Sequence, residues 1–83
     1  MSVAIELILL SRSYCHLCDE MAAALTPLAG EFAATVTVRD VDADPALAAR
    51  YDERVPVLLH GGTELCHYVL DTAKVREYLA GLR

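Results

Sequence analysis

The chain has 83 residues, of which 55% are hydrophobic and 23% are charged, and its formal net charge is −5. This length predicts one domain spanning residues 1–83, and the high apolar content excludes a disordered chain. Because a phosphate backbone is bound by a basic patch, an acidic chain with seven scattered cations is not expected to bind nucleic acid.

The cysteine count and the N-terminus bear on the cellular compartment. Three cysteines are too few, and odd in number, for a secreted disulfide scaffold. No basic residue precedes the apolar run at the N-terminus and Glu6 interrupts it, which argues against a secretory signal. No stretch reaches the roughly 18 apolar residues of a membrane helix. We therefore expect a cytoplasmic monomer without a membrane partner, and the excess of arginine and alanine indicates a bacterial source.

Residues 3–10 are predicted to form the first strand, and the unbroken apolar run at their end indicates a strand covered on both faces. From Cys15 to about Phe32, apolar residues recur at the spacing of one helical face. Pro27 falls inside this helix, but the apolar stripe continues beyond it, so we expect a kink rather than two helices.

The remaining elements follow closely along the chain. Residues 35–41 alternate and are β-branched, which predicts a second strand. Asp44 followed by Pro45 predicts the start of a short helix that ends near Tyr51. Residues 56–60 and 63–69 are predicted to be antiparallel strands, because the two glycines between them suit a hairpin turn. Asp71 is expected to cap a last helix.

The predicted order is therefore β-α-β-α-β-β-α, an α/β fold with a four-stranded mixed sheet and three helices. The first β-α-β unit is expected to have parallel strands joined by a right-handed crossover. We expect residues 3–10 to lie inside the sheet, between residues 35–41 and 56–60. In open α/β sheets, functional sites form at the carboxyl ends of the strands.

A cysteine pair stands in the loop after the first strand, in "SRSYCHLCDE". Cys15 and Cys18 are three residues apart, a spacing that lets a helix N-terminus close a disulfide without moving the backbone. Cys15 is expected to be the more exposed thiol, with a pKa below about 8.5, because free amides of the first turn stabilise a thiolate. A protonated His16 would lower this pKa further, and Asp19 and Glu20 would raise it. This asymmetry favours a redox pair with Cys15 as nucleophile and Cys18 as resolving thiol.

Two other interpretations of the cysteine pair remain open at this stage. Cys15, Cys18, Cys66 and His67 together offer enough ligand atoms for a four-coordinate zinc site. Against this, one pair is expected at a helix start and the other on an extended strand. If these residues hold a metal, the chain is a binding module without turnover. An inert cysteine pair is the third interpretation.

The first strand, "SRSYCHLCDE", "VDADPALAARYDERVPVLL" and the terminal helix resemble the small glutaredoxin-like proteins of the thioredoxin-fold superfamily. The resemblance covers nearly the whole chain and implies a thiol–disulfide oxidoreductase that serves electron transport and cell redox homeostasis. It also implies that the Val55–Pro56 bond is cis and faces the cysteine pair.

The resemblance further implies which residues bind the substrate. Arg12 takes the place of a basic residue that anchors a glutathione carboxylate, and Tyr14 lines the groove. The backbone of Val55, before Pro56, holds the cysteinyl part of glutathione. The implied partners are a protein or low-molecular-weight disulfide and a reductant, either glutathione or a thioredoxin-type protein. No resident cofactor and no bound metal are implied, and glutathione enters as a co-substrate.

The chain departs from the glutaredoxin pattern at two places. Its pair encloses His16 and Leu17, where glutaredoxins usually have Pro and Tyr. The Gly-Gly-x-Asp run before the last helix is replaced by residues 66–69, "CHYV". Because side chains there obstruct a ligand that must touch the backbone, we expect weak glutathione binding. Cys66 is expected to pack as a small apolar residue, with a third redox thiol as the alternative.

Overall fold

The computed structural model describes residues 4–82. Its elements are β1 (Glu6–Ser11), α1 (His16–Glu31), β2 (Thr35–Asp40), the 3₁₀ turn η1 (Val41–Ala43), α2 (Pro45–Tyr51), β3 (Val57–His60), β4 (Thr63–His67) and α3 (Thr72–Gly81). The strand order is β2-β1-β3-β4. β1 is parallel to β2 and antiparallel to β3, and β3 is antiparallel to β4. The predicted four-stranded mixed sheet with three helices is therefore confirmed, and so is the inner position of β1.

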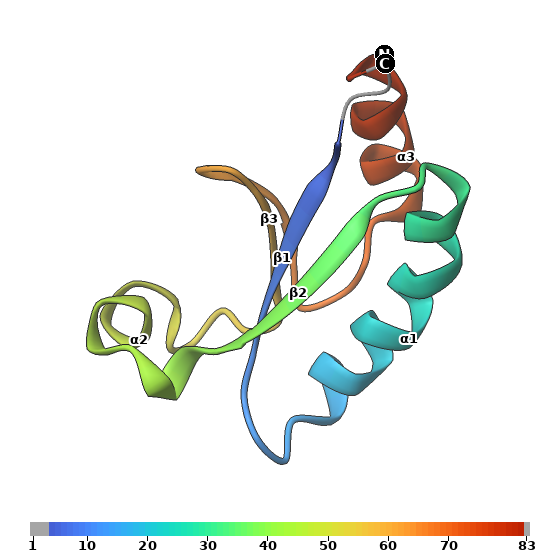
Figure 1. Ribbon diagram of the computed structural model, residues 1–83. Coiled ribbons are helices and arrows are strands. Elements are labelled where there is room, and N and C mark those ends of the chain that lie inside the picture. The colour runs from blue at the N-terminus through green and yellow to red at the C-terminus, as the bar shows by residue number, and fades with distance from the viewer. Residues whose placement is uncertain (1–3, 83) are drawn as a thin grey trace.

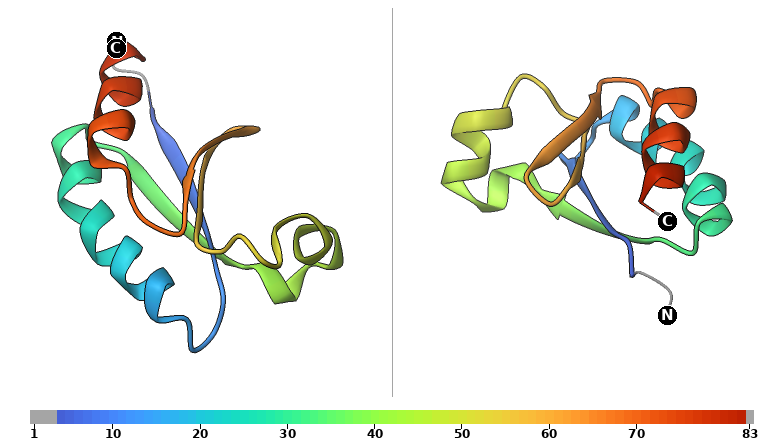
Figure 2. Two further views of the ribbon diagram at one scale, coloured as in Figure 1. Left: turned by 180° about the vertical axis from the view of Figure 1, so that it is seen from behind. Right: turned by 90° about the horizontal axis from the view of Figure 1, so that it is seen from above.

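Helices cover the sheet on both faces. α1 and α3 lie on one face, and α2 with η1 lies on the other (Figures 1 and 2). Leu7 and Leu9 of β1 belong to the larger core, on the side of α1 and α3, whereas Leu10 belongs to the smaller core. The buried residues of the smaller core are Leu10, Val41, Tyr51, Val57 and Leu59. All three leucines are at most 1% exposed, which confirms that the apolar run of β1 is covered on both sides.

The predicted helix caps are present. Asp44 accepts a hydrogen bond from the N–H of Ala46 at 2.9 Å, and Pro45 is the first residue of α2. Asp71 accepts one from the N–H of Lys74 at 3.1 Å at the start of α3. In each case a short acidic side chain satisfies an amide that the first helical turn leaves without a partner.

α1 is a single helix of 16 residues that continues through Pro27, which confirms that the proline does not divide it. The apolar stripe explains this, because Met21, Leu25 and Leu28 are all buried against the sheet. Between residues 4 and 82, no helix is long and apolar enough to cross a membrane.

Strand ends differ from the prediction where the chain turns toward the core. β2 ends at Asp40, one residue early, because the fully buried Val41 turns into the smaller core and Asp40 accepts the N–H of Asp42 at 2.9 Å. β4 ends at His67, two residues early, because Tyr68 adopts a φ of 65° that no strand accommodates. β1 begins at Glu6, and the predicted start at residue 3 lies outside the described residues.

Candidate functional site

Four connecting segments leave the sheet from the same edge. Ser11 at the end of β1 lies opposite Asp40 at the end of β2. Leu10 is paired with Val57 at the start of β3, and Val57 is paired in turn with His67 at the end of β4. The loop into α1, the η1 turn, the loop before β3 and the turn after β4 are therefore neighbours at this edge.

The first of these segments carries a disulfide between Cys15 and Cys18. Their Cα atoms are 5.2 Å apart, within the range of about 4.4–6.8 Å that a disulfide needs. Cys15 is the N-cap of α1, and its Sγ accepts a hydrogen bond from the N–H of Cys18 at 3.1 Å. Cys15 is half-buried and Cys18 is only 1% exposed. The predicted difference in exposure is confirmed, and an amide donor is in place to stabilise a thiolate on Cys15.

The loop before β3 contains a cis peptide bond between Val55 and Pro56, as predicted. Pro56 is fully buried, and its carbonyl accepts the N–H of Tyr68 at 2.9 Å. Val55 is half-buried and packs against the smaller core. Among residues 4–82, the N–H and the C=O of Val55 have no hydrogen-bond partner. Both groups can therefore pair with the main chain of an extended ligand.

Side chains from β4 and the turn after it hold this loop. The hydroxyl of Tyr68 donates to the carbonyl of Glu53 at 2.6 Å. Arg54 forms an ion pair with Glu64 of β4, with a nitrogen–oxygen distance of 2.6 Å. These contacts hold the loop at the two residues that precede Val55.

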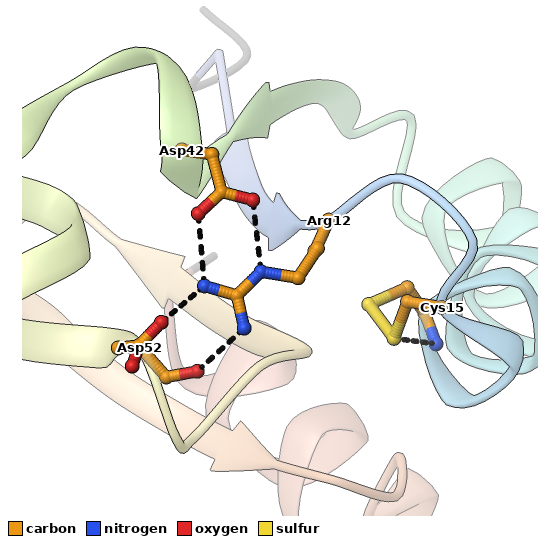
Figure 3. Close-up of a disulfide and its surroundings, with 5 residues drawn as sticks. Arg12, Cys15, Asp42 and Asp52 are labelled. Atoms are coloured by element: carbon orange, nitrogen blue, oxygen red, sulfur yellow. Dashed lines mark hydrogen bonds and ion pairs between the residues drawn. A yellow bond between two sulfur atoms is a disulfide. The ribbon is translucent and has the colours of Figure 1, made fainter.

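Arg12 holds the same loop from the other side. Its Nε and Nη2 atoms each lie 2.9 Å from an oxygen of Asp42, and its Nη1 donates to the carbonyl of Asp52 at 3.1 Å. Arg12 also forms an ion pair with the carboxylate of Asp52. Figure 3 shows the guanidinium pointing toward these two aspartates and away from the disulfide. A ligand carboxylate at the predicted Arg12 anchor would therefore have to compete with both of them.

Comparison with known proteins identifies the family. A family model described as Glutaredoxin-like domain matches residues 6–80. The chain belongs to this glutaredoxin-like family. The uncharacterized protein Rv0508 of Mycobacterium tuberculosis is 31% identical over 77 residues, which cover 87% of this chain and 79% of that protein. The predicted family is thereby confirmed.

Solved structures agree with the family assignment. The solution structure of protein Ne2328 from Nitrosomonas europaea has a TM-score of 0.84 and 35% identity, and 94% of each chain is covered. The thioredoxin Deadhead of Drosophila melanogaster has a TM-score of 0.63 and 27% identity, with 96% of this chain and 82% of that chain covered. This glutaredoxin-like domain therefore has the thioredoxin fold, as predicted, and it carries its Cys15–Cys18 pair at the start of α1.

Tyr14 lies immediately before the pair in this glutaredoxin-like domain. Its φ is 60°, in the left-handed region that non-glycine residues rarely adopt, and its side chain is fully exposed. The side chain therefore does not cover the end of α1. It is free to contact a ligand of Cys15, and its predicted role in the groove stays a prediction.

The third cysteine lies in the core. Cys66 is 9% exposed within the larger core, and burial raises the pKa of its thiol, so its predicted packing as an apolar residue is confirmed. His67 is exposed, with Nδ1 3.2 Å from Glu64. Among the described residues, no three His, Cys, Asp or Glu side chains are grouped to hold a metal ion. The zinc site considered for Cys15, Cys18, Cys66 and His67 is therefore not assembled among these residues.

The Arg12 contacts predict a pH-dependent contribution to stability. The hydrogen bond from Arg12 lowers the pKa of Asp42 below its ordinary value of 3.8, so the pair stabilises the fold above that pH and stops doing so as the pH falls through the folded-state pKa. We expect Arg12→Met to lower the urea midpoint at about pH 7 and to have little effect at about pH 2. Urea unfolding of both proteins at the two pH values measures this.

The matched control is Arg39→Met, which removes a cation from β2 that forms no ion pair among the described residues. Its midpoint is expected to stay close to that of the unaltered protein at both pH values. An Arg12→Met midpoint that equals the Arg39→Met midpoint near neutral pH would contradict a stabilising role of these contacts.

Proposed function

We propose that this glutaredoxin-like domain is a thiol–disulfide oxidoreductase in which Cys15 attacks the substrate and Cys18 resolves the intermediate. The observation that carries the proposal is the asymmetry of the pair. Cys15 is accessible and its sulfur accepts the Cys18 amide at 3.1 Å, whereas Cys18 is buried behind it. A stabilised, accessible thiolate is the attacking form of a cysteine, and a shielded neighbour is suited to resolution.

In the proposed reaction the reduced protein begins with two thiols. The Cys15 thiolate attacks one sulfur of the substrate disulfide, the Cys15–substrate bond forms, and the other substrate sulfur leaves as a thiolate. The Cys18 thiolate then attacks the Cys15 sulfur, so that the disulfide of the pair re-forms and the second substrate thiolate leaves. Two electrons pass from the protein to the substrate. A thiol reductant, either glutathione or a thioredoxin-type protein, returns the pair to its reduced form.

The surrounding residues receive roles that follow from their positions. The unpaired backbone groups of Val55 are proposed to bind the substrate main chain beside the pair, and buried Pro56 keeps them at the sheet edge. The exposed ring of Tyr14 contacts the substrate next to Cys15. Arg12 supports the loop before β3, which contains Val55, through its hydrogen bond to the carbonyl of Asp52. A cytoplasmic location fits this dithiol chemistry, since thiols stay reduced there.

A redox titration tests the proposed function. The Cys66→Ala variant, which leaves only the two thiols of the pair, is equilibrated with mixtures of reduced and oxidised dithiothreitol, and the disulfide fraction is measured by mass after alkylation. We expect one reversible two-electron transition in the folded protein. A pair that stays oxidised until the protein unfolds would overturn the proposal. Stoichiometric zinc on the reduced thiols, measured in the purified protein, would support a binding module instead.

A further inference from the structure

Exposed apolar side chains gather beside the disulfide. Among residues 4–82, the exposed large apolar side chains are Tyr14, Leu17, Val38, Tyr68 and Val69. Four of these five belong to the loop into α1, the first turn of α1 or the turn after β4, and only Val38 lies on the edge strand β2. Leu17 stands between the two cysteines, and Tyr14 stands directly before the first of them.

Three of these side chains, those of Leu17, Tyr68 and Val69, form part of the wall of a hollow of about 160 Å³. It is lined by Leu17, Glu20, Met21 and Ala24 of α1 and by Tyr68, Val69 and Leu70 after β4. Six of these seven side chains are apolar or aromatic, and the buried Met21 connects the hollow to the larger core. A cavity with such a lining accepts an apolar side chain, because burial of apolar surface supplies the binding energy.

Tyr68 connects this hollow to the unpaired backbone of Val55. Its N–H donates to the carbonyl of Pro56 at 2.9 Å, and its hydroxyl donates to the carbonyl of Glu53 at 2.6 Å. The same residue lines the hollow. One surface therefore offers a main-chain donor, a main-chain acceptor and an apolar cavity, and an extended polypeptide is the kind of ligand that uses all three.

The charges around this surface disfavour an anionic ligand. Glu20 is the charged residue among the described residues that line the hollow. Arg54, which belongs to the loop before β3, and Arg12, which contacts Asp52, are both already paired with carboxylates. The chain as a whole carries a net charge of −5. A glutathione disulfide brings several carboxylates to this region, where like charges repel them.

We infer that the substrate is a polypeptide disulfide in which the residue next to the reactive cysteine, on either side, is apolar and neither neighbour is acidic. This inference rests on the proposed function. The extended main chain pairs with Val55, the apolar side chain enters the hollow beside Leu17 and Val69, and the substrate sulfur meets Cys15. The electrons come from the reduced Cys15–Cys18 pair, which becomes a disulfide as two peptide thiols are released.

The test uses single-turnover exchange with pre-reduced Cys66→Ala protein and defined disulfides. Two synthetic peptides differ only in the residue beside their single cysteine, Leu in one and Glu in the other, and each is supplied as its symmetric disulfide. Hydroxyethyl disulfide and glutathione disulfide are the small probes. We expect the Leu peptide to react about tenfold faster than the Glu peptide, and faster than glutathione disulfide.

A variant pair ties this preference to the hollow. Val69→Ser is expected to reduce the rate ratio of the Leu peptide to the Glu peptide several-fold, whereas Val38→Ser, which removes an exposed valine on β2, leaves the ratio unchanged. Equal rates for the two peptides, or a faster reaction with glutathione disulfide, would overturn the inference while exchange itself remains. Failure to exchange with every probe, hydroxyethyl disulfide included, would instead overturn the proposed function.

Discussion

Cys15→Ser is expected to reduce disulfide exchange to the rate of the buffer alone, whereas Cys18→Ser is expected to accumulate a mixed disulfide on Cys15. A serine hydroxyl neither forms a disulfide nor ionises near neutral pH, so loss of the accessible sulfur removes the first step. Loss of Cys18, which is 1% exposed, removes only the second step. Exchange rates with hydroxyethyl disulfide and intact-protein mass spectra measure both effects.

Cys66 supplies the control for this comparison. Its thiol is buried and burial raises its pKa, so it is expected to remain unmodified in the folded Cys15→Ser protein and Cys66→Ala is expected to leave exchange unchanged. Peptide mapping locates the adduct of Cys18→Ser. An adduct on Cys66, or equal residual activity of the Cys15 and Cys18 variants, would contradict the assigned roles.

Local sequence signals were sufficient for most of the fold. The apolar run of β1, the Asp44-Pro45 start of α2 and the Asp71 cap each act within a few residues, and each is present as predicted. Gly61 in the hairpin has a φ of 60°, a conformation that glycine adopts without steric cost. The N-cap position of Cys15 was predictable in the same way, because the strand ends and the helical apolar stripe begins around it.

The interactions that shape the candidate site were not predictable from the sequence. Arg12 was identified through the resemblance to glutaredoxins, but its partners Asp42 and Asp52 lie 30 and 40 residues further along the chain. The chain contains twelve acidic residues, and only the folded sheet edge selects these two. Tyr68 likewise leaves the strand because its N–H and hydroxyl donate to the loop before β3. This tertiary contact ends the strand earlier than the predicted range of residues 63–69.

The position of Cys15 and Val55 at one edge depends on the sheet that carries them. β1 is hydrogen-bonded to both β2 and β3, and its side chains enter both cores. Any loss of packing around β1 therefore affects both segments that hold the site, the loop into α1 and the loop before β3. The stability of the domain and the geometry of the candidate site have this strand in common.

Leu9→Ala is accordingly expected to lower the free energy of unfolding by about 2–5 kcal/mol, because it leaves a cavity under α1 and α3. A chain of 83 residues has a total of about 4–12 kcal/mol, so the variant is expected to lose a large part of its stability. Urea unfolding followed by circular dichroism measures the change.

The matched control is Val38→Ala. Val38 is paired with Leu9 in the sheet register but is 59% exposed, and the expected change in its free energy of unfolding is within about 0.5 kcal/mol. Similar losses for the two variants would show that Leu9 does not occupy the densely packed central position described above.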